Sequence, residues 1–182
     1  MPKTSAGLRQ PLNSTSTQTL DRRSMPTNKT DQLTPAGRLN ESRLSGLIGY
    51  QIAQADITAL GVFEREVGKP MGLRPVEFAI LTLVCENPGV TSVRLANALA
   101  LSAPSVTVWL DKLEARTLII RRSSESDRRR THLHATQQGM EAANRAIERV
   151  TFGEQETFKD LTPGERMLLV ELLHKVASRR GS

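Results

Sequence analysis

The stretch Leu101–Gly139, LSAPSVTVWLDKLEARTLIIRRSSESDRRRTHLHATQQG, constrains the fold of this chain most strongly. Its first part predicts an amphipathic helix, because apolar side chains recur there at helical spacing. Ser102 is a suitable N-cap, and Pro104 stands in the first turn, where a missing N–H group has no cost. The apolar face must be buried, so we expect all of its members in the core: Val106, Trp109, Leu110 and Leu113.

The opposite face of this helix carries small side chains. Such a face lets a helix lie deep in the major groove of DNA, while hydroxyl groups contact base edges and phosphates. We therefore predict DNA contacts from Ser102, Ala103, Pro104, Ser105, Thr107 and Val108.

A β-hairpin with a cationic tip is predicted after the helix. A short run of apolar, largely β-branched residues ends at Ile120, and residues 131–135 alternate between polar and apolar, so two strands flank a polar segment. A hairpin tip is narrow enough to enter a minor groove, where the negative potential attracts arginine. The tip holds five arginines against Glu125 and Asp127: Arg121, Arg122, Arg128, Arg129 and Arg130.

The charge distribution agrees with a polyanionic partner. The formal net charge is +6. Residues 1–40 hold six Lys or Arg against two Asp, and residues 115–135 hold six Arg against two acids, so each stretch carries +4. The positive charge is therefore concentrated on one tail and on the hairpin, as expected for a protein that binds nucleic acid.

Several function classes lack sequence support. No window approaches 18 consecutive apolar residues and no signal peptide is evident, so we expect a cytoplasmic protein without a membrane partner. The single cysteine, Cys85, excludes an intrachain disulfide. No nucleophile elbow, phosphate-binding glycine loop or His/Glu metal spacing is present, so we expect neither an enzyme nor a cofactor.

The N-terminal half predicts a tail and three helices. Residues 1–40 are polar and aperiodic, which is typical of a disordered tail. A helix is expected from about residue 41 to residue 67, ending at Gly68, and Pro75 begins the next. Thr91 caps a short third helix, with Val93, Leu95, Ala96 and Leu99 turned inward. A turn of about four residues then leads to the first-described helix, which completes a helix-turn-helix.

Two helices are predicted after Gly139. The first carries apolar side chains on one side, at Met140, Ala143, Ala146, Ile147 and Val150. The second begins with a capping box at Thr162 and Glu165 and has a broad leucine-rich surface. One small domain cannot easily cover that surface, so we expect a two-fold dimer through helices at both chain ends.

This order of elements resembles the MarR family of winged helix-turn-helix transcriptional regulators over about residues 43–178. The most specific match is DRRRTHLHATQQG, which is similar to the family's Asp-x-Arg followed by Thr-x-x-Gly; these places are occupied here by Asp127, Arg129, Thr136 and Gly139. The segments LEARTLI and GLRPVEFAIL are also similar to the family's sequence pattern. Three positions depart from the pattern: Val108 replaces a common basic residue, Thr117 a glycine, and Arg74 a small capping residue.

The resemblance implies a mainly α fold with a β-hairpin wing. The winged helix-turn-helix would span about residues 74–136, and dimerisation helices would span about residues 43–67 and 138–178. It further implies that Arg129 enters the minor groove, Asp127 holds it through an ion pair, and Arg128 contacts phosphate. Thr91 and Ser92 would face phosphate at a helix N-terminus.

Family members bind DNA as homodimers, and many release it on binding a small, often aromatic molecule. By resemblance we expect a ligand-responsive repressor on a pseudo-palindromic operator. Polar and aromatic residues on the first long helix are candidates for an effector pocket: Tyr50, Gln51 and Gln54. The alternative is a helical interaction protein whose basic wing binds RNA or an acidic partner.

Two side-chain types admit more than one interpretation. Cys85 shares a helix face with Phe78 and Leu81, which favours an inert core thiol over an oxidant sensor. His132 and His134 point to the same face of one strand, a geometry that can bind metal. Without an evident third ligand, a histidine pair facing solvent or DNA is the favoured interpretation.

Overall fold

The computed structural model describes residues 33–123 and 131–180, and the chain divides into two compact units, residues 1–48 and 49–182. In the first unit Leu33 and Asn40 pair as an antiparallel bridge. The hydroxyl of Thr34 donates to the carbonyl of Ala36 at 2.6 Å inside this turn. Residues 33–40, within the tail predicted to lack order, therefore form a turn; the prediction for residues 1–32 falls outside the described part of the chain.

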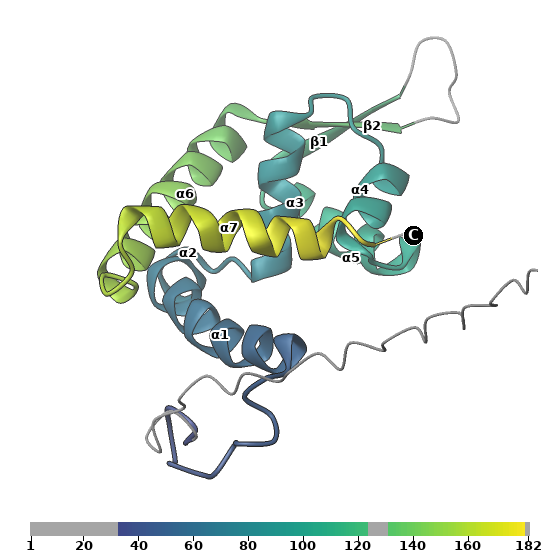
Figure 1. The fold of residues 1–182 in the computed structure, drawn as a ribbon. Helices are drawn as coiled ribbons and strands as arrows, with labels where there is room; N and C mark the ends of the chain where they lie inside the picture. Colours follow the sequence, from purple (N-terminus) through teal and green to yellow (C-terminus); the bar gives the residue numbers. More distant parts are fainter. Residues whose placement is uncertain (1–32, 124–130, 181–182) are drawn as a thin grey trace, which may run out of the picture. The chain divides into compact units, whose positions relative to one another are not determined.

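The described residues form a mainly helical fold with one antiparallel hairpin, as predicted (Figure 1). The elements are α1 (Ile48–Phe63), η2 (Glu64–Gly68, a π-helix), α2 (Lys69–Met71), α3 (Pro75–Glu86), α4 (Ser92–Leu99), α5 (Ala103–Ala115), β1 (Ile119–Ser123), β2 (Thr131–Ala135), α6 (Gln137–Thr157) and α7 (Pro163–Ala177). Within the described ranges no single helix has the length and apolar composition to cross a membrane, although α4 and α5 together, bent by 113°, satisfy both criteria.

Both ends predicted for the first long helix were wrong. It begins at Ile48 and not near residue 41; Gly46 lies just before it, and glycine disfavours helix by about 1 kcal/mol relative to alanine. It also continues past Gly68, through η2 and α2, to Gly72. Gly72 has a left-handed φ of 62°, which is the usual way for a helix to end.

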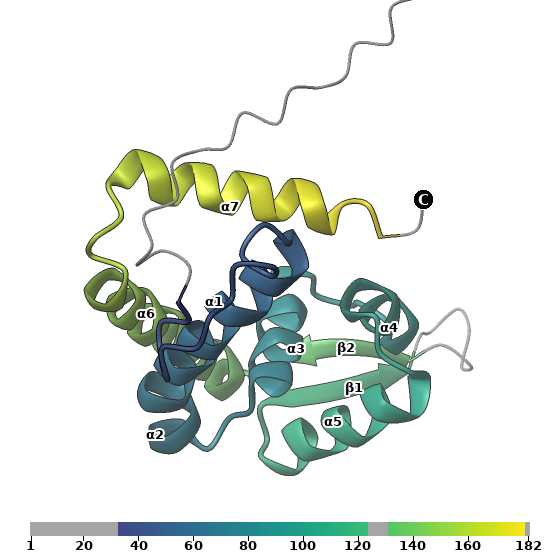
Figure 2. The ribbon, with the colours of Figure 1, turned by 60° about the horizontal axis from the view of Figure 1, so that its bottom comes forward.

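The core is built around α3, which contacts α5, α6 and β2 (Figure 2). Glu77 begins this helix: its carboxylate accepts a hydrogen bond from the backbone N–H of Arg74 at 2.8 Å and is itself buried. Glu77 thus satisfies the N–H of the N-cap residue Arg74, whose own side chain makes no capping hydrogen bond. The fully buried apolar side chains around α3 include Val67, Ile80, Leu81, Val84, Val106, Leu113, Ile119, Leu133 and Ala146.

Two predicted core residues lie at the edge of the core. Trp109 is half-buried, with Lys112 Nζ 4.4 Å and the Arg74 guanidinium carbon 5.6 Å from its ring centre, so two cations lie against the ring. Cys85 is also half-buried and packs against the core. Burial raises the pKa of its thiol, and the nearby Glu86 raises it further, so the thiol is protonated at neutral pH.

The predicted inner face of α6 is only partly buried. Ala143 and Ala146 are in the core, and Val150 is half-buried. Met140 and Ile147 remain exposed, contrary to a fully covered face. Gly153 lies where α6 approaches the first long helix, and an added Cβ would stand 2.9 Å from a methyl carbon of Val62.

Candidate nucleic-acid interface

The predicted helix-turn-helix is formed by α4 and α5, and both predicted caps are present. The Thr91 hydroxyl accepts from the backbone N–H of Arg94 at 3.4 Å, and the Ser102 hydroxyl accepts from that of Ser105 at 3.3 Å. The turn between the helices is residues 100–102, where Ala100 takes a left-handed φ of 52°. Pro104 stands in the first turn of α5, as expected.

The outward face of α5 is exposed, but its hydroxyl groups are already engaged. The Thr107 hydroxyl donates to the carbonyl of Ala103 at 3.1 Å, and the Ser102 and Ser105 hydroxyls bond to each other at 2.8 Å. Each hydroxyl keeps acceptor capacity beside these bonds, so its contact with DNA stays a prediction. Five of the six predicted contacts are exposed and Ser105 is half-buried; the five are Ser102, Ala103, Pro104, Thr107 and Val108.

The start of α4 places Thr91 and Ser92 together, both half-buried. The prediction that Val93 turns inward was wrong, because 62% of it is exposed. Leu95 is buried on the inner face, and a residue two positions earlier points about 200° away around an α-helix. The N-terminal end of α4 thus presents two hydroxyl residues and an exposed valine.

The two strands pair from Ile119 with Ala135 to Ser123 with Thr131. The end of the hairpin at Ser123 and Thr131 lies on the same side as the N-terminal end of α5 (Figure 2). The exposed residues Arg122 and Ser123 lead toward the predicted tip. Four predicted contacts fall outside the described residues: Asp127, Arg128, Arg129 and Arg130.

Arg121 is predicted to contact DNA, and in the structure its side chain is bonded to α5 of its own chain. Its guanidinium lies 2.6 Å from a carboxylate oxygen of Asp111 and 2.8 Å from one of Glu114. The two acids stand three residues apart on α5, which places them on one face of the helix. This pair of bonds ties β1 to α5 and offsets the charge of Arg121, a connection that the sequence pattern did not indicate.

A third segment joins the hairpin. Val90 forms an antiparallel bridge with Leu133, and the His132 ring nitrogen Nδ1 lies 2.8 Å from the carbonyl oxygen of Gly89. His132 and His134 are both half-buried beside this loop, and their contact with solvent or DNA stays a prediction. No group of three or more His, Cys, Asp or Glu side chains in the described ranges is arranged to hold a metal ion.

The Thr-x-x-Gly motif forms the junction of α5, β1 and α6. Thr136 caps α6 by accepting from the Gly139 N–H at 2.9 Å, and its hydroxyl donates to the carbonyl of Thr117 at 2.7 Å. A Cβ on Gly139 would lie 1.9 Å from the carbonyl oxygen of Leu118, so only glycine fits. Thr117, where the family has glycine, keeps the tight turn with a left-handed φ of 56°.

Comparison with known proteins identifies this arrangement. The sequence model of the MarR family matches residues 73–131. A proposed transcriptional regulatory protein for the hcr operon of Thauera aromatica is 30% identical over 133 residues, which cover 73% of this chain and 80% of that protein. The chain belongs to the MarR family.

Solved structures of MarR-type regulators share the fold. The transcriptional repressor CouR bound to a 23-mer DNA duplex is 31% identical, with a TM-score of 0.71, and the match covers 77% of this chain and 99% of CouR. CouR from Rhodococcus jostii RHA1 bound to p-coumaroyl-CoA is 26% identical, with a TM-score of 0.66 and coverages of 76% and 96%. The predicted winged-helix fold is confirmed, and the protein is a DNA-binding transcriptional regulator and not an enzyme.

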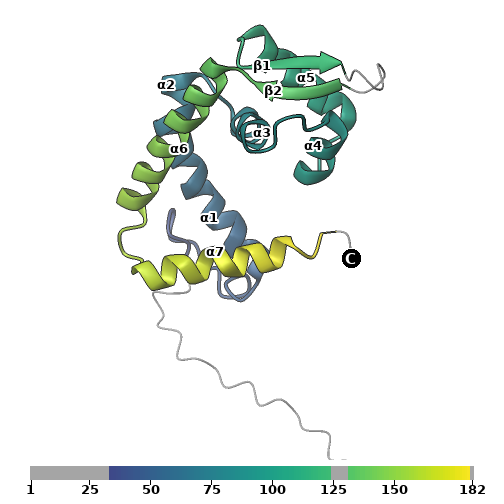
Figure 3. The ribbon, with the colours of Figure 1, turned by 90° about the horizontal axis from the view of Figure 1, so that it is seen from above.

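In this MarR-family chain α7 has no buried residue. Figure 3 shows it running away from the end of α6, clear of α4, α5 and the hairpin. The predicted capping box is present, since Glu165 accepts from the Thr162 N–H at 2.8 Å. The exposed apolar side chains of α7 are Met167, Leu168, Leu169, Val170, Leu172, Leu173 and Val176, and those of α1 include Ile48, Ile52, Ile57 and Leu60.

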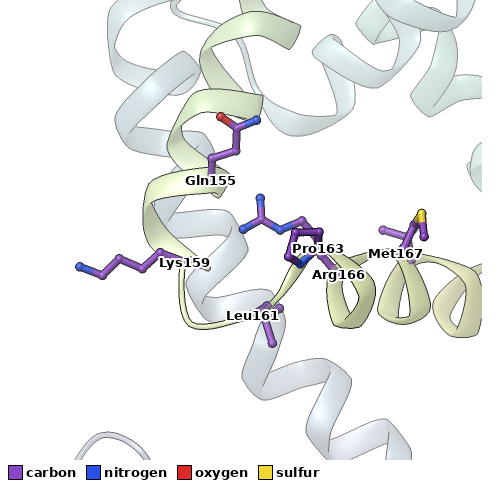
Figure 4. A pocket seen from close by; sticks show the side chains of 7 residues that line it. Gln155, Lys159, Leu161, Pro163, Arg166 and Met167 are labelled. Carbon is purple, nitrogen blue, oxygen red and sulfur yellow. The ribbon is translucent and has the colours of Figure 1, made fainter.

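A groove of about 620 Å³ lies where α6 turns into α7 (Figure 4). It is lined mainly by Gln155, Lys159, Leu161, Pro163, Arg166, Met167 and Val170. One arginine nitrogen, Nη2 of Arg166, donates to the carbonyl of Phe158 at 3.1 Å. The predicted effector residues do not line this groove: on α1, Tyr50 and Gln54 are half-buried and Gln51 is exposed.

Proposed function

We propose that this MarR-family regulator is a homodimeric, ligand-responsive repressor that binds a pseudo-palindromic operator. One observation carries the proposal: the exposed start of α5 lies on the same side as the end of the hairpin at Ser123 and Thr131 (Figure 2). A helix in the major groove and a hairpin in the adjacent minor groove require this common direction.

Each part of the interface has a distinct role in this proposal. Residues 74–136 bind DNA, and the residues of the start of α5 that lie in the major groove are Ser102, Ala103, Pro104, Ser105, Thr107 and Val108. Thr91 and Ser92 contact phosphate at the start of α4. The tip residues Asp127, Arg128, Arg129 and Arg130 retain the roles that the family resemblance implies, in and beside the minor groove. Arg121 positions the hairpin against α5, because its guanidinium already has two carboxylate partners.

A second copy of the chain is the occupant proposed for the exposed apolar faces of α1 and α7. Soluble monomers rarely expose a large apolar surface, and a two-fold dimer is the commonest way to cover one. Dimerisation through residues 43–67 and 138–178 would also place two copies of α5 about one helical turn of DNA apart. Light scattering on the purified protein tests this: Leu172→Asp should give a monomer, and Arg179→Asp, beyond the end of α7, should leave the dimer intact.

The effector proposal is supported by the relative that binds p-coumaroyl-CoA. The dimer would have two conformations that differ in the spacing of its two DNA-binding parts, and only one of them fits the operator. A small molecule that binds the other conformation more tightly would shift the dimer toward it and so release the operator. We propose Tyr50, Gln51 and Gln54 as its contacts and the cytoplasm as the place of action. Screening aromatic acids and their thioesters for release of bound operator tests this part.

The experiment that tests DNA recognition is selection of binding duplexes from a random library with the full-length chain. We expect selected duplexes with two-fold related half-sites centred about 10 base pairs apart, bound far more tightly than scrambled duplexes. Replacing Arg129 with alanine should weaken specific binding by about 1 to 3 kcal/mol. Equal affinity for any duplex, RNA or acidic polymer would refute the proposal and favour the interaction protein with a basic wing.

A further inference from the structure

The part of α5 that would face the bases has an unusual chemistry for a recognition helix. Its first two turns have the sequence APSVTVWL, with no Arg, Lys, Asn, Gln, Asp, Glu or His. Bidentate contacts to guanine and adenine in the major groove come from Arg, Lys, Asn and Gln. This stretch of α5 therefore has no side chain for such a contact.

The polar residues that follow on α5 are already engaged. Asp111 bonds to Arg121, and Lys112 lies over the Trp109 ring with its Nζ 4.4 Å from the ring centre. At the start of the helix the Ser102 and Ser105 hydroxyls bond to each other. None of these side chains is held in place for base recognition.

What remains exposed is apolar. Val108 is 51% exposed although it has two methyl groups. Thr107, one residue earlier, is also exposed. Because its hydroxyl hydrogen is donated to the carbonyl of Ala103, the methyl group on its Cβ is the substituent that we expect to contact a base. Ala103 and Pro104 extend the same apolar character to the N-terminal end of the helix.

The major groove offers one apolar group to such a surface, the C5 methyl of thymine. Resting on the proposed function, we propose that Thr107 and Val108 make α5 a sensor of thymine methyl groups, so that each operator half-site places A·T pairs beneath its second turn. Specificity at these pairs then comes from burial of methyl surface and not from hydrogen bonds to base edges. The methyl group of 5-methylcytosine occupies the same place in the groove and should be recognised as well.

The test uses the selected operator, with each thymine replaced in turn by 2′-deoxyuridine. This change removes one methyl group from the major groove and leaves the pairing edge and the minor groove unchanged. At one or two positions in each half-site we expect affinity to fall about fourfold, the factor for burying one group of this size. Replacing the equivalent thymines of both half-sites should lower affinity on the order of 15-fold. The same replacement at thymines where the wing lies in the minor groove should leave the affinity unchanged.

Matched variants connect the loss to the two side chains. We call the ratio of the affinities for the thymine duplex and the 2′-deoxyuridine duplex the uridine penalty. Val108→Ala and Thr107→Ser remove methyl groups and should make the two affinities nearly equal. Thr107→Val keeps the methyl group and should keep the penalty. Val93→Ala, an exposed valine on α4, should leave the uridine penalty unchanged. Unchanged melting temperatures would show that each variant is folded.

A second arm replaces the sensitive T·A pair with 5-methylcytosine·guanine or with cytosine·guanine. The methylated pair should restore most of the affinity that the unmethylated pair loses. The inference is overturned if the operator is bound specifically but every uridine substitution is neutral, or if the penalty persists in both Val108→Ala and Thr107→Ser. Failure of the proposed function is distinct, because then no specific duplex is selected at all.

Discussion

Replacement of Gly139 by alanine tests the junction of α5, β1 and α6. The new Cβ would lie 1.9 Å from the carbonyl oxygen of Leu118, whereas close C···O contacts are about 3.3 Å. That oxygen also accepts from the Thr136 N–H at 3.0 Å, so it cannot move away freely. Overpacking costs about 1 to 3 kcal/mol and a lost hydrogen bond about 1, against about 1 gained from helix propensity. We therefore expect the free energy of unfolding to fall by about 2 kcal/mol.

The assay is denaturant and thermal unfolding followed by circular dichroism. For a chain of this length, a loss of 2 kcal/mol corresponds to a fall in melting temperature of about 4–8 °C. Gly164→Ala is the matched control, because a Cβ there meets nothing within 4 Å and should be neutral or slightly stabilising. Equal or greater stability of Gly139→Ala would show that the backbones do not approach this closely, and the explanation of the Thr-x-x-Gly motif would be wrong.

Three further predictions concern local contacts. Thr117→Asn should raise the free energy of unfolding by about 1 kcal/mol, measured by denaturant titration, because asparagine tolerates a left-handed φ better than a β-branched residue. Asp111→Asn should weaken operator binding in fluorescence anisotropy about two- to fivefold if Arg121 positions the hairpin; stronger binding would show that Arg121 contacts phosphate. Hydrogen bonds from the Thr162 backbone and hydroxyl lower the pKa of Glu165, so its stabilisation is present at neutral pH and lost as pH falls through that lowered pKa. The stability difference between the wild type and Glu165→Gln should therefore shrink toward pH 3.

Features that depend on near neighbours could be predicted from the sequence. Thr91, Ser102 and Thr162 each cap the helix expected of them, because the hydroxyl and the N–H that it accepts are only three residues apart. The hairpin followed from alternation of polar and apolar residues, and the helix-turn-helix from two short helices joined by a brief turn. These signals require no knowledge of how distant segments meet.

Features that depend on distant segments were missed. The bridge between Val90 and Leu133 joins residues with no shared pattern, and the sequence did not indicate that Arg121 bonds to Asp111 on α5. The Arg116 guanidinium donates to the carbonyl oxygens of Gly72 and Met71 at 2.8 and 2.9 Å, which no local signal indicated. A charge pattern gives the number of cations near a surface but not which of them have partners.

The π-helix η2 sets the rotational phase of everything before it on the same helix. Its backbone includes the carbonyl of Glu66, to which the Arg149 side chain of α6 donates. A π turn holds one more residue than the corresponding stretch of α-helix. Deleting a single residue between 64 and 68 would therefore let this segment wind as an ordinary α-helix and leave the direction of α1 nearly unchanged, whereas deleting Gly61 within α1 would turn the residues before it by about 100° and shift them by about 1.5 Å along the axis. The exposed side chains of Ile57 and Leu60 would then point in another direction, although neither residue had been changed.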